Sequence, residues 1–221
     1  MQPKYATKEN AEKIIRILTR EYKVPRSALR FSNPLQVLVA TMLSAQCTDI
    51  RVNMVTPALF RKYRSVKDFA NADLKELEQI IRSTGFYHMK ARHIIDSSKM
   101  IVNDFHSQVP DSMENLLKLP GVARKTANMV LSEGYGKLVG IVVDTHVTRL
   151  SYRLGLTKNR EPVKIEQDLM KIFPKSNWRA LSHFLVFHGR AVCTAKKPKC
   201  EICSLRKLCP RRQGRNSIPC E

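Results

Sequence analysis

Hydrophobic residues recur at intervals of three and four along most of the chain, which is the spacing of one face of an α-helix. The first such face contains Ala11, Ile14, Ile15, Leu18 and Tyr22. Pro25 is expected to end this helix, because proline has no backbone N–H to continue it. Asn33 and Pro34 have the residue types of a helix N-cap and first turn, and residues 35–43 are apolar nearly all round. A helix without a polar face is expected to be central and buried.

Turn and cap residues divide the rest of the chain into further helical segments. Thr48 can cap a helix that Pro57 is expected to kink. Further helices are expected from Asp73 to near Gly85, from about His88 to Asn103, from Asp144 to Gly155, from Glu161 onward, and from about Asn177 to Ala191. The apolar run Leu138–Val143 has no partner strand, so we interpret it as a buried connection. With no convincing strand pair or repeat, we predict an all-α fold of about ten helices in two lobes.

Two predicted helices meet at residues 119–128, LPGVARKTAN, where Pro120 and Gly121 interrupt the helical spacing. The segment that follows is amphipathic, with Ala123, Ala127, Val130 and Leu131 on one face and Arg124, Lys125, Asn128 and Ser132 on the other. This is the pattern of a helix-hairpin-helix, whose exposed backbone N–H groups can hold a phosphate. Taken alone, it is more typical of a phosphate-binding module with a solvated lysine at position 125 than of a catalytic site.

The charge of the chain indicates a polyanionic partner. The 39 Lys and Arg residues outnumber the 19 Asp and Glu residues and give a formal net charge of +20, while the hydrophobic share of 43% is ordinary. Nucleic acid is the first candidate and an anionic membrane surface the second. No basic amphipathic helix stands out, and no run approaches the roughly 18 apolar residues of a membrane-spanning helix. We therefore expect a soluble, intracellular protein that does not bind membranes.

Four cysteines lie close together near the C-terminus. Cys193, Cys200, Cys203 and Cys209 have the spacing C-x6-C-x2-C-x5-C, so their sulfurs could surround one compact metal centre. This spacing favours a 4Fe-4S cluster. A structural zinc site, which more often uses two C-x2-C pairs, and unligated thiols remain alternatives. Cys47 and Cys220 fall outside the spacing and receive no function.

Basic residues lie between and after these cysteines. They are Lys196, Lys197, Lys199, Arg206, Lys207, Arg211, Arg212 and Arg215. They could form a solvated basic tail. A metal that fixed this otherwise irregular loop would also fix the charges in space, which would suit a phosphate-binding surface.

Five stretches carry a resemblance to a known family. In chain order they are SAQCTD at 44–49, TGFY at 84–87, the hairpin LPGVARKTAN at 119–128, VDTH at 143–146 and the cysteine spacing. The same stretches occur in the same order in the endonuclease III family of DNA glycosylases. The chain resembles this family over nearly its whole length. The resemblance implies a six-helix barrel domain at residues 27–137 and a discontinuous second domain, residues 1–26 and 138–221, that carries the 4Fe-4S cluster.

The resemblance also implies roles for single residues. Members of the family remove damaged bases, typically oxidised pyrimidines, and those with a hairpin lysine cut the strand at the resulting abasic site. Lys125 matches that lysine, and Asp144 matches the family's catalytic aspartate. Gln46 matches the glutamine that fills the space left by the extruded nucleotide, and Phe86 matches a wedge residue that is usually leucine.

Four further residues are expected to bind DNA: Gly121 and Ala123 in the hairpin, and Lys196 and Lys197 in the cysteine loop. The expected partner is double-stranded DNA that contains damaged bases or abasic sites. We expect a monomer in the cytoplasm, associated with the nucleoid.

Each of the matched residues also has a simpler interpretation. Gln46 could be a polar residue at a helix end, and Phe86 could be a core aromatic. Asp144 has the residue type of an N-cap, which needs no catalytic explanation, although an N-cap can also supply a fixed negative charge. His146 is interpreted as a structural partner in the same turn.

Two other functions compete with the glycosylase–lyase. One is a mismatch glycosylase of the same fold that removes thymine or adenine opposite a normal base. The other is a non-catalytic DNA-binding protein that combines the hairpin with a zinc loop. Lys125 and Asp144 argue against the second, because phosphate binding requires neither.

Overall fold

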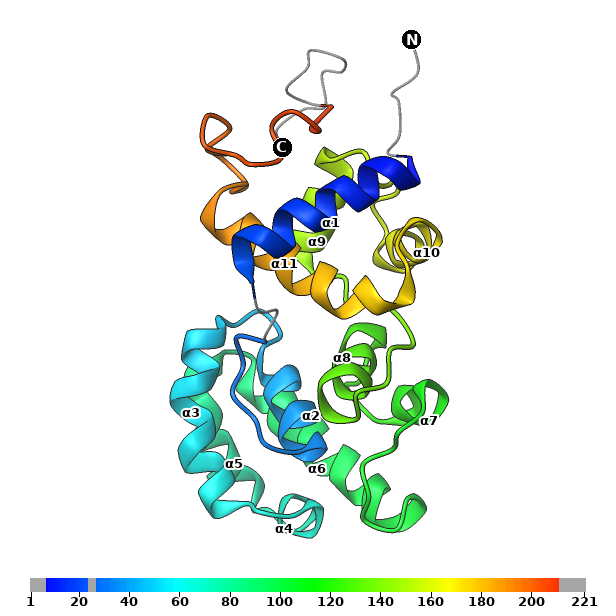
Figure 1. The fold of residues 1–221 in the computed structure, drawn as a ribbon. Coiled ribbons are helices and arrows are strands. Elements are labelled where there is room, and N and C mark those ends of the chain that lie inside the picture. The colour runs from blue at the N-terminus through cyan, green and yellow to red at the C-terminus, as the bar shows by residue number, and fades with distance from the viewer. Residues whose placement is uncertain (1–6, 24–26, 211–221) are drawn as a thin grey trace. The chain divides into compact units, whose positions relative to one another are not determined.

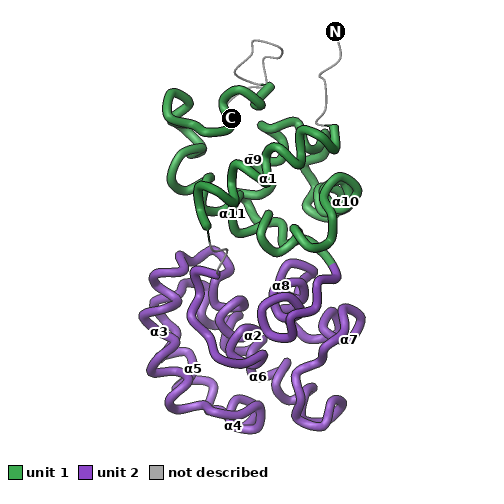
Figure 2. The backbone as a smooth tube through the Cα atoms, viewed as in Figure 1, with its two compact units in different colours: residues 1–26, 140–221 green, residues 27–139 purple. Residues whose placement is uncertain are grey.

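The computed structural model is built from helices and describes residues 7–23 and 27–210, within which no strand occurs (Figure 1). The predicted all-α fold is confirmed. The chain forms two compact units: unit 1 comprises residues 1–26 and 140–221, and unit 2 comprises residues 27–139 (Figure 2). The expected assignment of residues 27–137 to a barrel domain, and of 1–26 with 138–221 to a cluster domain, stays a prediction. Within the described ranges, no helix is long and apolar enough to cross a membrane.

Unit 2 is organised around one buried helix. Its helices are α2 (Pro34–Leu43), α3 (Asp49–Lys62), α4 (Val66–Ala70), α5 (Leu74–Ile81), the 3-10 turn η1 (Arg82–Thr84), α6 (Tyr87–Asp104), α7 (Met113–Lys118), α8 (Arg124–Met129) and the π-helical turn η2 (Val130–Gly134). In α2, eight side chains are buried, and the helix contacts α3, α6, α8 and η2. The predicted central, buried helix is therefore confirmed.

The starts of α2 and α3 follow from local hydrogen bonds. The Asn33 side chain accepts a hydrogen bond from the N–H of Gln36 at 2.9 Å, and Pro34 occupies the first turn of α2. Thr48 accepts from the N–H of Arg51 at 3.3 Å and caps α3, which contains Pro57. These caps satisfy backbone donors that have no partner within the helix, which is why the predicted starts are confirmed.

The hairpin joins α7 to α8 through a turn that requires glycine. Gly121 has a φ of +73°, and a Cβ atom there would lie 2.6 Å from Nδ1 of His93. The expected amphipathic segment after the turn is partly wrong. Asn128 and Ser132 are buried and Ala123 is exposed. One reason is that α8 contacts α2, α7 and η2, which bury more than one side of the helix. Another is that the π-helical turn η2 has a different number of residues per turn, so α-helical spacing no longer separates buried from exposed positions there.

Unit 1 combines the two ends of the chain in one core. Its helices are α1 (Lys8–Tyr22), α9 (Thr145–Arg153), α10 (Pro162–Ile172), the 3-10 turn η3 (Lys175–Asn177) and α11 (Trp178–Ala191). The predicted apolar face of α1 packs with residues of α9, α10, α11 and the cysteine loop, including Leu150, Phe184 and Leu205. Burying one such side chain stabilises the fold by about 1.5–3 kcal/mol. Helix α1 ends at Tyr22, and Pro25 lies outside the described residues.

The segment before α9 has no regular secondary structure, as expected for a connection between helices. Burial is uneven along it: Val139 is 41% exposed, whereas Ile141 is 1% exposed. The expected buried connection is therefore correct only from Gly140 onward, where the chain enters the core of unit 1.

Candidate functional site

Lys125 is exposed and lies in the second position of α8, directly after the glycine turn. The turn is tied to α6, because the Ser97 hydroxyl donates a hydrogen bond to the carbonyl of Pro120 at 2.6 Å. Ala123 forms the N-cap of α8 and provides no side-chain hydrogen bond. The hairpin therefore presents an amine on a turn that is held by its neighbours.

Gln46 and Phe86 lie at the ends of two different helices in unit 2. Gln46 is exposed in the turn after α2, and Phe86 is 64% exposed at the start of α6. The alternative of a core aromatic is wrong. Both residues have left-handed backbone angles, with φ of 51° for Gln46 and 49° for Phe86. Such angles are uncommon outside glycine and persist only where the surrounding structure holds the backbone.

Asp144 is the N-cap of α9 in unit 1. Its Oδ1 atom accepts a hydrogen bond from the N–H of Val147 at 2.8 Å, and the residue is half-buried. The capping role is confirmed, and the catalytic role stays a prediction.

His146 follows in the first turn of α9. Its Nδ1 atom lies 3.1 Å from Nη2 of Arg149, and the ring packs so closely on Gly189 that a Cβ atom there would lie 2.8 Å away. Burial lowers the pKa of His146, although the charge of Asp144 opposes this shift. These contacts hold the ring on two sides and support the predicted structural role of His146 in this turn.

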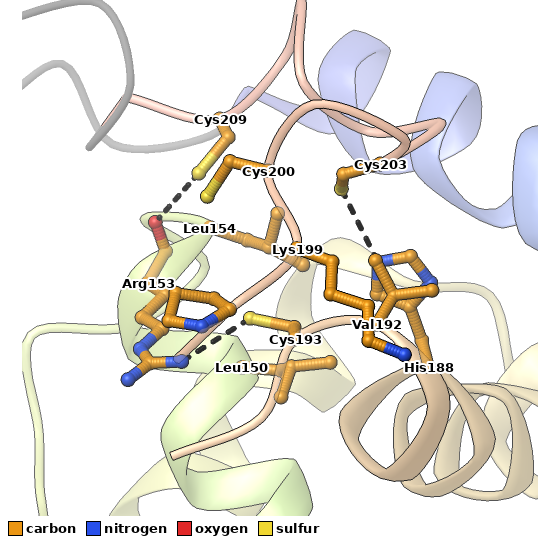
Figure 3. Close-up of a pocket in the computed structure, with 11 residues that line it drawn as sticks. Leu150, Arg153, Leu154, His188, Val192, Cys193, Lys199, Cys200, Cys203 and Cys209 are labelled. Carbon is orange, nitrogen blue, oxygen red and sulfur yellow. Dashed lines mark hydrogen bonds between the residues drawn. The ribbon is translucent and has the colours of Figure 1, made fainter. Parts of the chain in front are cut away.

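The four cysteines of the predicted metal centre line one cavity of about 240 Å³ in unit 1 (Figure 3). Within the described part of the chain, no three His, Cys, Asp or Glu side chains converge on a position for a single metal ion. The four thiols that line this cavity are soft ligands of the kind that an iron-sulfur cluster uses. Burial raises the pKa of the Cys203 thiol to about 11, so a bound cation is needed to hold this sulfur as a thiolate at neutral pH.

Two buried side chains that the sequence analysis did not single out contact the cysteine sulfurs. Arg153 is 5% exposed and its Nη1 atom donates to Sγ of Cys193 at 3.3 Å, while Nε2 of the 1% exposed His188 lies 3.3 Å from Sγ of Cys203 (Figure 3). Sequence did contain a signal. Arg153 lies three residues after the core residue Leu150, and His188 lies three and four residues after Leu185 and Phe184, so each falls on an apolar helix face where a polar side chain is unexpected.

Arg153 also holds the backbone of the cysteine loop. Its guanidinium donates to the carbonyl of Thr194 at 2.7 Å and to that of Ala195 at 2.8 Å. The next two residues, Lys196 and Lys197, are exposed. Arg153 therefore anchors the loop on one side of these lysines. Of the other predicted basic and cysteine residues, Arg211, Arg212, Arg215 and Cys220 lie outside the described residues.

Comparison with known proteins identifies the family. Residues 39–175 match the model of the HhH-GPD superfamily base excision DNA repair protein, and residues 193–209 match the iron-sulfur binding domain of endonuclease III. Endonuclease III of Synechocystis sp. is 52% identical over 207 residues, which cover 94% of each chain. The chain belongs to the endonuclease III family. It is a base excision repair DNA glycosylase with abasic-site lyase activity, and it carries a 4Fe-4S cluster.

Solved structures support the same assignment. A trapped covalent intermediate of endonuclease III with DNA, in an estranged-adenine complex, has a TM-score of 0.90 and 41% identity over 95% of this chain and 99% of that chain. A thermostable thymine-DNA glycosylase has a TM-score of 0.83 over 93% of this chain and 97% of that chain. Its identity of 21% shows a shared fold alone. The mismatch-glycosylase and zinc-loop alternatives are therefore not favoured.

Proposed function

We propose that this endonuclease III family member removes oxidised pyrimidines from double-stranded DNA and cleaves the strand at the resulting abasic site. Unit 2 would be the barrel domain with the hairpin, and unit 1 the cluster domain. The protein would act as a monomer and associate with the nucleoid through its net charge of +20. The observation that supports the lyase step best is the exposed amine of Lys125, directly after a turn that only glycine can form.

Lys125 is proposed as the nucleophile. Its neutral amine attacks C1′ of the damaged nucleotide, the bond from C1′ to the base breaks, and the base leaves with the bonding electrons and takes up a proton. Opening of the sugar ring gives an imine between Nζ and C1′. The imine acidifies the 2′ hydrogen, so its removal expels the 3′ phosphate by β-elimination. Water then hydrolyses the imine and regenerates the amine.

Asp144 is proposed to stabilise positive charge that develops on the sugar as the base departs. Its hydrogen bond from the N–H of Val147 fixes the direction of the carboxylate. A fixed charge needs no reorganisation during the reaction, and this is the arrangement that makes electrostatic catalysis effective.

Gln46 and Phe86 are proposed to extrude the damaged nucleotide. A base inside a duplex cannot be reached, and opening the stack costs about a few kcal/mol. Phe86 offers an exposed aromatic ring that can enter the stack, and the exposed Gln46 amide can occupy the space left by the nucleotide.

Phosphate binding is proposed for two surfaces. In unit 2 it involves the hairpin backbone at Gly121 and Ala123, and in unit 1 the exposed Lys196 and Lys197. The 4Fe-4S cluster, bound by the four cysteines, would fix the conformation of the loop between them. The loop and its lysines then meet DNA phosphates without first paying an ordering cost in free energy.

Borohydride trapping tests the proposal directly. Borohydride reduces the imine to a stable amine, so the wild-type protein should become covalently linked to duplex DNA that contains one abasic site. The matched variants are Lys125→Ala, which should form no adduct, and Arg124→Ala, which should still form one. Trapping at full yield by Lys125→Ala would overturn the assignment. A panel of duplexes with an oxidised pyrimidine or a thymine opposite guanine should show release of the oxidised base first.

A further inference from the structure

Lys90 is a buried lysine that connects two separate turns of unit 2. It lies on α6, is 5% exposed, and its Nζ atom donates hydrogen bonds to the carbonyl of Leu43 at 2.7 Å and to the carbonyl of Thr84 at 2.8 Å. Leu43 is the last residue of α2, and Thr84 is the last residue of η1. Both carbonyls belong to helix ends, where the oxygen has no partner within its own helix. A single ammonium group therefore provides a hydrogen-bond donor to the last carbonyl of two helices.

The two turns that Lys90 joins are those that present Gln46 and Phe86. Gln46 stands three residues after Leu43, and Phe86 stands two residues after Thr84. Both residues have left-handed backbone angles, which cost about 1 kcal/mol or more each for a residue other than glycine. Surrounding contacts must hold these angles, and hydrogen bonds at the preceding carbonyls fix the point from which each turn departs.

A buried ammonium loses more hydration free energy than an apolar side chain of the same size. Burial lowers the pKa of Lys90, and the nearby Cys47 opposes this shift without cancelling it; in the part of the chain that the structure describes, no carboxylate contacts the ammonium. A methionine of similar length would fill the same volume without loss of hydration. The contribution of the ammonium is therefore geometric: unlike an apolar group, it can donate to both carbonyls and hold them at fixed separation.

We propose that Lys90 is the positioning residue of nucleotide extrusion, because it holds the turns of Gln46 and Phe86 in one fixed arrangement. This inference rests on the extrusion role proposed above for those two residues. With both turns held, the protein opens the base stack without first ordering its own loops, so more of the binding free energy remains for unstacking. Without the ammonium, the two turns would move independently, and Phe86 and Gln46 would no longer act together.

Lys90→Met tests the inference, because it keeps the apolar stem and removes both hydrogen bonds. The matched control is Lys99→Met, the same change at an exposed position of α6. Single-turnover removal of thymine glycol would be measured in a paired duplex and in an unpaired bulge, where the stack is already open. Stopped-flow fluorescence of 2-aminopurine beside the lesion would report extrusion.

Lys90→Met should slow both extrusion and base removal in the paired duplex by about 10- to 100-fold, the effect of misplacing a reacting group by about 1 Å. In the bulge the rate should fall by less than about 3-fold, and Lys99→Met should behave as wild type. A role in folding alone would slow both substrates equally. Equal rate losses on the two substrates, or none on either, would overturn the inference.

Two further variants separate this inference from the function on which it rests. If Gln46→Ala and Phe86→Ala leave extrusion unchanged, the extrusion roles proposed for Gln46 and Phe86 are wrong. If those variants slow extrusion and Lys90→Met does not, only the role of Lys90 fails. Should Lys90→Met not fold, Lys90→Gln replaces it in the same comparison: a selective loss on the paired duplex supports the inference, and an equal loss on both substrates overturns it.

Discussion

The Nε2 atom of His188 lies 3.3 Å from the Sγ atom of Cys203 in unit 1. The other ring nitrogen, Nδ1, lies 2.9 Å from the hydroxyl of Tyr22. Burial lowers the pKa of His188, although the charge of Glu21, whose Oε1 atom lies 3.8 Å from Nδ1, opposes this shift. A cysteine sulfur that binds the cluster is a thiolate and can only accept, so the ring hydrogen is on Nε2 and points to the sulfur, while Nδ1 faces the Tyr22 hydroxyl. Tyr22 of α1 thus contacts the ring that donates to a cluster ligand.

His188→Leu is expected to lower the reduction potential of the 4Fe-4S cluster. A hydrogen bond to a ligand sulfur stabilises the more negative, reduced form, so its removal favours the oxidised form. Hydrogen bonds to charged groups are worth about 1.5–3 kcal/mol, and only the difference between oxidation states counts, so the shift should be on the order of tens of millivolts. Protein-film voltammetry measures it. His188→Gln, which keeps an N–H donor, should shift the potential less. An unchanged potential at full iron content would contradict the prediction.

The purified protein is expected to be brown, with about four iron and four sulfide per chain. Cys203→Ser should lose the cluster and weaken both folding and binding to undamaged duplex, because the loop that carries Lys196 and Lys197 is no longer fixed. Iron and sulfide analysis, thermal unfolding and a binding titration measure these effects. Cys47→Ser is the control, since Cys47 lies in unit 2 and outside the cysteine spacing. A stable, colourless Cys203→Ser protein with full DNA affinity would argue against the role of the loop.

Affinity for undamaged duplex is expected to fall steeply with salt concentration. Each phosphate that a lysine neutralises contributes about 0.9 to the slope of log affinity against log salt, so Lys196→Ala and Lys197→Ala should each reduce the slope by about 1. Lys13→Ala is the control, because Lys13 lies on α1 and pairs with Glu9 at 2.6 Å. If the slope in all three variants equals that of the wild-type protein, the phosphate contacts lie elsewhere.

The sequence predicted the features that depend on near neighbours. Helix α6 was expected from about His88 to Asn103 and runs from Tyr87 to Asp104, because its limits depend on turn residues beside it. The contact of Lys90 with Leu43 spans 47 positions, and that of Arg153 with Cys193 spans 40. Periodicity contains no information on such partners. The burial of Asn128, which the spacing placed on a polar face, likewise follows from the contacts of α8 with other elements of unit 2.

Asp144→Asn is expected to separate capping from catalysis. The asparagine oxygen can still accept the hydrogen bond from the N–H of Val147, so the melting temperature should change little. Loss of the negative charge should slow base removal by about 10- to 1000-fold, the range of one electrostatic or proton-transfer contribution. Asp144→Ala should lose the same activity and also about 0.5–2 kcal/mol of stability, because the cap is removed. Single-turnover kinetics and thermal unfolding distinguish the two. Normal base removal by Asp144→Asn would show that Asp144 caps α9 and has no catalytic role.

Lys125→Ala is expected to separate binding from chemistry. Lys125 is exposed, and its removal leaves the glycine turn, the exposed Phe86 and the basic cysteine loop unchanged, so affinity for damaged duplex should change little. Imine trapping and strand cleavage should both disappear, because β-elimination requires the imine and the substituted side chain has no amine to form one. The two readouts test different steps, since trapping detects the covalent bond and cleavage detects its consequence.

Arg124→Ala is the matched control for this experiment, because Arg124 and Lys125 are adjacent residues in the first turn of α8. Removal of the arginine takes away the same charge from the same turn, so any effect of charge alone on binding should appear equally in both variants. Only Lys125→Ala should lose the covalent adduct. If Lys125→Ala kept full strand cleavage while Arg124→Ala lost it, the nucleophile would be the wrong residue, and the role of every residue assigned from the hairpin register would have to be reconsidered.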